Sequence, residues 1–249
     1  MANPVLNETV FRREASTSAN DVMTVKGTMT KALLLLVLVV AAAAYTWKLF
    51  YEAVNPATSI SWMWGGLIVA LISALVINFR PKTAPYLSPV YAASEGMVLG
   101  AVSAVYNSAF AETAPNIVIN AVLLTLICAF VMLTVYRSGI VKVNGTFFKV
   151  LTVSLTTILV FYLGSYILSM FGVDMSLLHG TSLLSIGISF VIVAVAAFSL
   201  ISNYYFIEEA SALGAPKHME WYGAFGIMVT LIWLYLEILK LLGKLNSRD

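Results

Sequence analysis

Residues 230–245 read TLIWLYLEILKLLGKL, an apolar stretch that carries a single acid, Glu237. The apolar residues predict a helix that crosses a membrane, where a carboxylate costs on the order of 3 kcal/mol. A chain tolerates this cost mainly where the group faces the interior of a helix bundle or a wet cavity. The stretch therefore predicts a bundle of membrane helices, and Glu237 is the first candidate functional residue.

The composition extends this interpretation to the whole chain. Of its 249 residues, 60% are hydrophobic and only 10% are charged, whereas soluble domains are about 25% charged. We therefore expect an all-α integral membrane protein in a lipid bilayer. The net charge of +2 and the lack of a basic cluster argue against binding of nucleic acid.

Seven stretches of the sequence are long and apolar enough to span a membrane, for which about 20 apolar residues are needed. Prolines, glycines and asparagines separate them. We expect a polar, cytoplasmic N-terminal tail (residues 1–30) followed by a seven-helix membrane domain (residues 31–249). The expected spans are 31–51, 60–79, 87–110, 116–136, 147–171, 180–206 and 220–245.

The basic residues are distributed unevenly between the connections. They precede the first span and occupy the connections between spans 2 and 3 and between spans 4 and 5, which indicates a cytoplasmic N-terminus by the positive-inside rule. Lys240, Lys244 and Arg248 conflict with seven full spans, because they would then lie outside. A last segment that crosses only partly, or folds back, would resolve the conflict.

A second acid, Glu95, lies well inside the third expected span. The nearby Gly96 and Gly100 belong to a surface of small residues, which lets another helix approach closely. Glu95 should therefore point into the bundle. Two interpretations stay open: a structural hydrogen bond to a neighbouring helix, or a direct role in an ion path.

The densest charged stretch of the C-terminal half joins the last two spans and reads FIEEASALGAPKHME over residues 206–220. It is either a solvated hairpin tip or a charged gate at the cytoplasmic mouth of a pathway. The residues of such a gate would be Glu208, Glu209, Glu220, Lys217 and Arg137.

Catalytic chemistry finds little support in the sequence. The motifs HExxH and GxSxG and the P-loop are absent, as are paired cysteines or histidines at metal-ligand spacing. None of the three aspartates, Asp21, Asp174 and Asp249, lies well inside a span, so an aspartate protease within the membrane is not indicated. We expect no enzymatic activity and no cofactor.

Three segments resemble the bacterial, YccA-type branch of the Bax inhibitor family, whose members carry the transmembrane BAX inhibitor motif. They are LSPVYAASEGMVLG (87–100), VYRSGIVKVNGTFFKV (135–150) and FIEEASALGAPKHMEWYGAFGIMVTLIWLYLEILKLL (206–242). The resemblance implies seven transmembrane helices with the last helix in the centre of the bundle, in the inner membrane of a bacterial cell. It further implies a pH-sensitive calcium leak governed by two acids on the last two helices. Other relatives are described as regulators of a membrane protease or of cell-death signalling.

The resemblance places Glu237, within LYLEI at 234–238, at the position of the second acid. Near the end of span 6, where the first acid is expected, the chain has Asn203 and no aspartate. If the last two spans form an antiparallel hairpin, the residue numbers of facing pairs sum to about 429, which sets Asn203 level with Gly226 or Ile227. Glu237 then needs a partner from another helix, and its depth favours Glu95.

These residues support two functions of different classes. The first is a passive, pH-modulated cation leak, with calcium as the transported ion and with Glu237, Glu95 and Asn203 along the ion path or sensing protons. Calcium prefers oxygen ligands, so a weak site at Glu237 would suit it. The alternative is a non-conducting regulator that binds a membrane protease or another integral membrane protein through its polar N-terminal tail.

Overall fold

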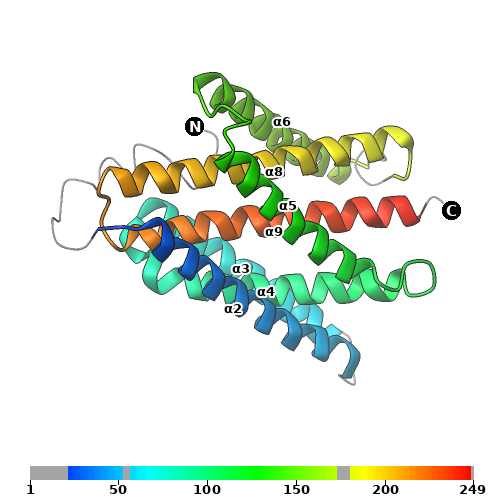
Figure 1. Cartoon of the computed structure of the whole chain (residues 1–249). Coiled ribbons are helices and arrows are strands. Elements are labelled where there is room, and N and C mark those ends of the chain that lie inside the picture. Colours follow the sequence, from blue (N-terminus) through cyan, green and yellow to red (C-terminus); the bar gives the residue numbers. More distant parts are fainter. Residues whose placement is uncertain (1–21, 53–56, 173–179, 248–249) are drawn as a thin grey trace. The chain divides into compact units, whose positions relative to one another are not determined.

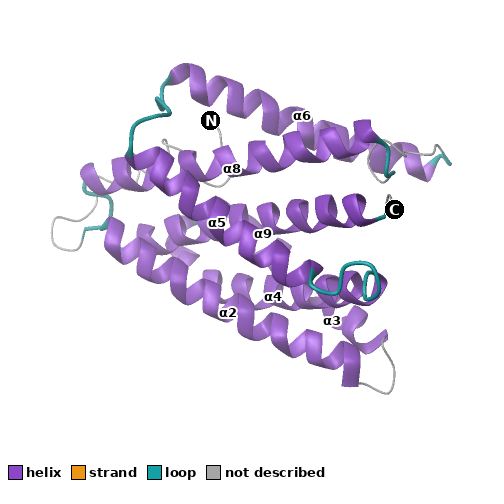
Figure 2. Cartoon of the chain, turned by 45° about the vertical axis from the view of Figure 1, so that its right-hand side comes forward, coloured by secondary structure: helices purple, strands orange, loops and turns teal. Residues whose placement is uncertain are grey.

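The computed structural model describes residues 22–52, 57–172 and 180–247. Within these ranges the chain forms seven α-helices, a 3-10 turn and no strands (Figure 2), which confirms the all-α prediction. Most of the expected N-terminal tail, together with Asp174 and Arg248, lies outside the described residues. The helices are α2 (Val25–Glu52), α3 (Ala57–Phe79), α4 (Ala84–Ala109), α5 (Ile117–Arg137), α6 (Gly145–Met170), α8 (Leu183–Ala212) and α9 (Met219–Asn246), and the 3-10 turn is η1 (Pro81–Thr83).

Six of these helices are long and apolar enough to cross a membrane: α2, α3, α5, α6, α8 and α9. They support an integral membrane protein. The helix α4 has sufficient length, but alanines, glycines and serines take the place of larger apolar residues. Its surface is shaped by contact with α2 and α3. A Cβ atom at Gly96 would meet the Val39 carbonyl of α2, and one at Gly100 would meet the Ala43 carbonyl.

The helices belong to two compact units, and α8 and α9 contribute residues to both. The unit called here the N-terminal unit contains Pro4–Ala109 and Asn203–Ile232. The C-terminal unit contains mainly Phe110–Ser202 and Trp233–Asp249. In the N-terminal unit, α2, α3 and α4 lie side by side (Figure 1).

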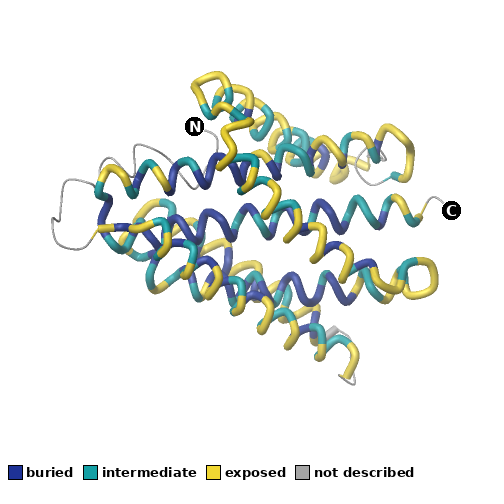
Figure 3. The backbone as a smooth tube through the Cα atoms, in the orientation of Figure 1, coloured by how far each residue is buried: buried dark blue, intermediate teal, exposed yellow. Residues whose placement is uncertain are grey.

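The last helix is the most deeply buried of the six candidate spans. In its most apolar window 61% of the residues are buried, against 44% in α8 and 22% or less in the other four helices. Figure 3 shows buried residues along most of its length. Most of this part of α9 is therefore covered by other parts of the chain, and its expected central position stays a prediction.

The helix α9 is also continuous, with 28 residues that extend over about 42 Å at 1.5 Å per residue. It neither stops short nor folds back within the described residues. Its register against α8 is set in the N-terminal unit by Asn203, whose amide nitrogen lies 3.2 Å from the Gly226 carbonyl oxygen and 2.8 Å from the Thr230 hydroxyl. The expected level of Asn203, opposite Gly226, is confirmed.

Candidate functional site

The carboxylate of Glu237 lies in the C-terminal unit, where it forms a triad with two other side chains. Glu237 is only 2% exposed. Tyr162 of α6 donates its hydroxyl to this carboxylate, at 3.1 Å from Oε1 and 3.0 Å from Oε2. Lys240, one turn further along α9, places its ammonium 3.1 Å from Oε1 and 5.2 Å from the centre of the Tyr162 ring. The carboxylate is therefore compensated by a phenol and an ammonium.

A third charged residue, Lys244, lies on the same face of α9, since positions i, i+3 and i+7 of a helix fall on one side. Its ammonium is 2.7 Å from the hydroxyl oxygen of Ser189 and 2.9 Å from that of Ser185, both on α8. The lysine and these two hydroxyls form a polar cage. Because two ammonium groups accompany one carboxylate, this face of α9 carries an excess of positive charge.

These contacts concern the two lysines that conflict with seven full spans under the positive-inside rule. That rule counts basic residues in the connections near the ends of the spans. Lys240 and Lys244 are instead bound to side chains of α6, α8 and α9. Both lysines therefore have partners among these helices, and the orientation of the chain stays a prediction.

A second buried acid, Glu220, lies in the first turn of α9 in the N-terminal unit and is 0% exposed. Its Oε1 atom accepts hydrogen bonds from the backbone nitrogen and the hydroxyl of Thr24, at 2.9 Å each. Lys31 of α2 forms an ion pair with Oε2, and Lys217 lies 3.0 Å from Oε1. At Gly27, a Cβ atom would occupy the space that the carboxylate fills.

Backbone contacts add to the connection between α2 and the α8–α9 turn, and we call this region the joint around Glu220. The Met23 nitrogen donates to the Ala215 carbonyl at 2.6 Å, and Val22 forms an antiparallel bridge with Pro216. Glu220 is therefore not part of a solvated hairpin tip. It connects the start of α2 to the start of α9.

The remaining predicted gate residues lie at the ends of helices. Glu208 is exposed and Glu209 half-buried near the end of α8, and Arg137 is exposed at the last residue of α5. Lys217, half-buried, is the predicted gate residue that contacts Glu220. Their common role at the mouth of a pathway stays a prediction.

Glu95 is half-buried on α4 in the N-terminal unit. Tyr91, one turn earlier on the same helix, forms a hydrogen bond with its side chain. The Tyr91 ring packs edge-on against Phe225 of α9, with 4.8 Å between the ring centres. Since Glu95 and Glu237 belong to different units, their expected pairing stays a prediction.

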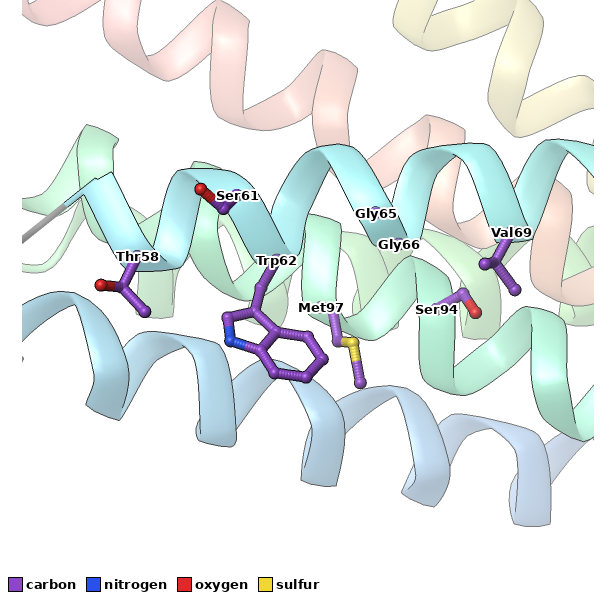
Figure 4. Close-up of a pocket in the computed structure, with 8 residues that line it drawn as sticks. All are labelled: Thr58, Ser61, Trp62, Gly65, Gly66, Val69, Ser94 and Met97. Carbon is purple, nitrogen blue, oxygen red and sulfur yellow. The ribbon is translucent and has the colours of Figure 1, made fainter.

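Two cavities differ in what they could accommodate. An open groove of about 640 Å³ runs between α3 and α4 (Figure 4). It is lined by Thr58, Ser61, Trp62, Gly65, Gly66, Val69, Ser94 and Met97. No acid lines this groove, so it offers no carboxylate to a cation.

The second cavity, of about 250 Å³, lies in the C-terminal unit. Three amide side chains, Asn116, Asn120 and Asn246, contribute to its lining. Within the described ranges, no group of three or more His, Cys, Asp or Glu side chains could hold a metal ion. The amide side chains of this cavity offer uncharged oxygens near the end of α9.

The sequence alone did not single out Tyr162 or the internal position of Lys240. The spacing of Glu237 and Lys240, three residues apart on one helix, was a usable signal for an ion pair. Tyr162 had no such signal, since it is one of several aromatic residues in α6 and no polar residue of that helix is spaced so as to mark it.

The chain was also compared with known proteins. A family model described as Bax inhibitor 1 like matches residues 3–247. No curated protein and no solved structure matches the chain.

Proposed function

The chain belongs to the Bax inhibitor 1 like family, and we propose that it is a passive calcium leak whose flux depends on pH. In this proposal Glu237 is the carboxylate of the ion path. The observation that supports it most directly is the burial of Glu237 in a helix long and apolar enough to cross a membrane. Ionisable residues at such a depth are rare and usually functional.

The chemistry around Glu237 suits a weak and transient calcium site. Hard cations are bound by carboxylate, carbonyl and amide oxygens, and conduction requires binding that is weak enough for release. The Glu237 carboxylate provides charge, and the amide-lined cavity at Asn116, Asn120 and Asn246 provides uncharged oxygens in the same unit. Protons and calcium would compete for the carboxylate, which gives the flux its pH dependence.

The proposal includes a bacterial inner membrane and a cytoplasmic N-terminus. Arg80 and Lys82 between α3 and α4, and Lys142 between α5 and α6, support this orientation by the positive-inside rule. Lys240 and Lys244, near the end of α9, both have side-chain partners in the C-terminal unit.

Calcium flux from purified protein in liposomes tests the proposal. Wild type is expected to release calcium at a rate that changes with pH, whereas Glu237→Gln should have no such pH dependence. Glu52→Gln is a suitable control, since Glu52 lies at the end of α2 in an exposed pair with Lys48. A Glu237→Gln protein with the wild-type flux and pH response would overturn the proposal.

A second candidate function is a non-conducting regulator that binds a membrane protease or another integral membrane protein. The ion pair at Glu237 and the additional charge of Lys244 favour it, because a face with excess positive charge repels cations. A deletion of residues 1–21 tests whether the tail binds the partner, since it preserves the Met23 and Thr24 contacts with the α8–α9 hairpin. Loss of the partner on co-purification, with the fold intact, would support the regulator, and unchanged partner binding would exclude a role for the tail.

A further inference from the structure

We propose that Lys240 is a tethered counter-ion that occupies the cation position at Glu237 and controls the entry of cations. This inference rests on the proposed function, because it assigns the control of the same ion path. The Lys240 ammonium is 3.1 Å from Glu237 Oε1 and lies over the ring of Tyr162. A calcium ion that binds the same oxygen would compete with this ammonium for the position.

The environment of Lys240 allows it to leave. Lys240 lies six residues before the end of α9 at Asn246, so its ammonium can extend toward the membrane surface while the aliphatic stem stays on the protein. The displaced charge would then not be left buried without a partner, which would be costly. Entry of a cation at this oxygen therefore requires displacement of Lys240.

Lys244 provides an internal contrast. It bears the same charge on the same face of α9, but Ser185 and Ser189 hold its ammonium through their hydroxyls. Lys244 repels cations through its field, whereas Lys240 also blocks the carboxylate oxygen by contact. A comparison of the two lysines thus distinguishes a general electrostatic effect on cation affinity from direct competition for the carboxylate oxygen.

A further oxygen lies on α6 near Tyr162. Ser165 lies one turn along α6 from Tyr162, is buried, and its hydroxyl has no hydrogen-bond partner among the described residues. Positions i and i+3 of a helix lie on nearby faces. When Lys240 leaves, Glu237, Tyr162 and Ser165 offer oxygens of the type that a hard cation takes.

Terbium binding to the detergent-solubilised protein tests this inference, with the sensitised luminescence of the ion as the readout. Lys240→Met should raise terbium affinity by roughly ten- to hundredfold, the range to which the loss of one charge-assisted contact corresponds. Lys240→Arg keeps a cation at Glu237 and should resemble wild type. Lys244→Met removes the same charge at a distance and should raise affinity by less than about threefold, because fields in a partly hydrated site are screened.

Calcium flux measured on the same variants separates this inference from the proposed function. Wild-type flux that depends on Glu237, with terbium affinity unchanged in Lys240→Met, would overturn the role of Lys240 alone. An equal rise in affinity in Lys240→Met and Lys244→Met would also overturn it, since a general field effect would then suffice. Absence of flux in every variant would reject the leak and leave terbium affinity as the test of Lys240. If Lys240→Met does not fold, Lys240→Gln supplies a neutral side chain of similar polarity.

Discussion

The joint around Glu220 gives the sharpest prediction for stability. Replacement of Glu220 by glutamine keeps the size of the side chain and an oxygen that can accept from Thr24. It removes the negative charge that the ammonium groups of Lys31 and Lys217 face. We therefore expect the variant to have a lower free energy of unfolding, because the contacts between the starts of α2 and α9 become weaker.

The magnitude follows from the two lost ion contacts. A hydrogen bond to a charged group contributes about 1.5–3 kcal/mol. The side chains of Lys31 and Lys217 are 20% and 44% exposed, so water compensates part of the loss and the lower limit applies to each. The expected loss in unfolding free energy is about 3 kcal/mol, the sum of two such contacts.

Unfolding by sodium dodecyl sulfate in mixed micelles measures this free energy. Glu52→Gln is the control, because the Lys48–Glu52 pair is 68% and 66% exposed and such pairs contribute about 0.5 kcal/mol or less. The double variant Glu220→Gln with Lys31→Met should be less destabilised than the sum of the single variants, since residues in contact are coupled. A Glu220→Gln protein within about 0.5 kcal/mol of wild type, the usual range of surface substitutions, would refute the reasoning.

Two further predictions concern helix packing. Gly100→Ala should destabilise the protein by about 1–3 kcal/mol, because its Cβ would meet the Ala43 carbonyl and the Thr46 hydroxyl. As a control, Gly65→Ala places its Cβ where no atom lies within 4 Å, so it should be neutral or stabilising by up to about 1 kcal/mol. Equal effects of the two variants in the same unfolding assay would contradict this. Thr230→Val removes the hydroxyl that Asn203 contacts at 2.8 Å. It should cost about 0.6–1.7 kcal/mol, between the average and the maximum for hydrogen bonds between membrane helices. Thr125→Val is its control, since that hydroxyl donates to Ala121 of its own helix, and an equal loss in both variants would exclude the contact between α8 and α9 as the cause.

The features that the sequence predicted are those set by local order. Spans follow from runs of apolar residues, and the level of Asn203 opposite Gly226 follows from the rise of a helix and the position of the turn between α8 and α9. Both depend on residues close together in the chain or on a short hairpin. The structure has a helix at each of the seven stretches, six of them long and apolar enough to cross a membrane, and it places Asn203 opposite Gly226.

The partners of the two buried acids could not be predicted in the same way. Thr24 is 196 residues from Glu220, and Tyr162 is 75 residues from Glu237. In a soluble helix, the contrast between polar and apolar faces would indicate which side packs inward. In α6 the polar and apolar residues are spread around the helix, so the sequence does not mark the face that contains Tyr162.

The sequence also could not predict which groups Lys240 and Lys244 bind. In the sequence they are basic residues near a chain end, which the positive-inside rule treats as topological signals. In the structure they bind Glu237 and the hydroxyls of α8. Only the tertiary contacts show that these lysines bind side chains of the bundle in addition to lying near a chain end.

Calcium efflux from liposomes over a series of pH values, with wild type and Glu237→Gln measured in parallel, tests the central claim most directly. The proposed leak predicts a flux that varies with pH in wild type and a flux independent of pH in the variant. The same pH profile in both proteins, or no calcium flux from wild type at any pH, would contradict it.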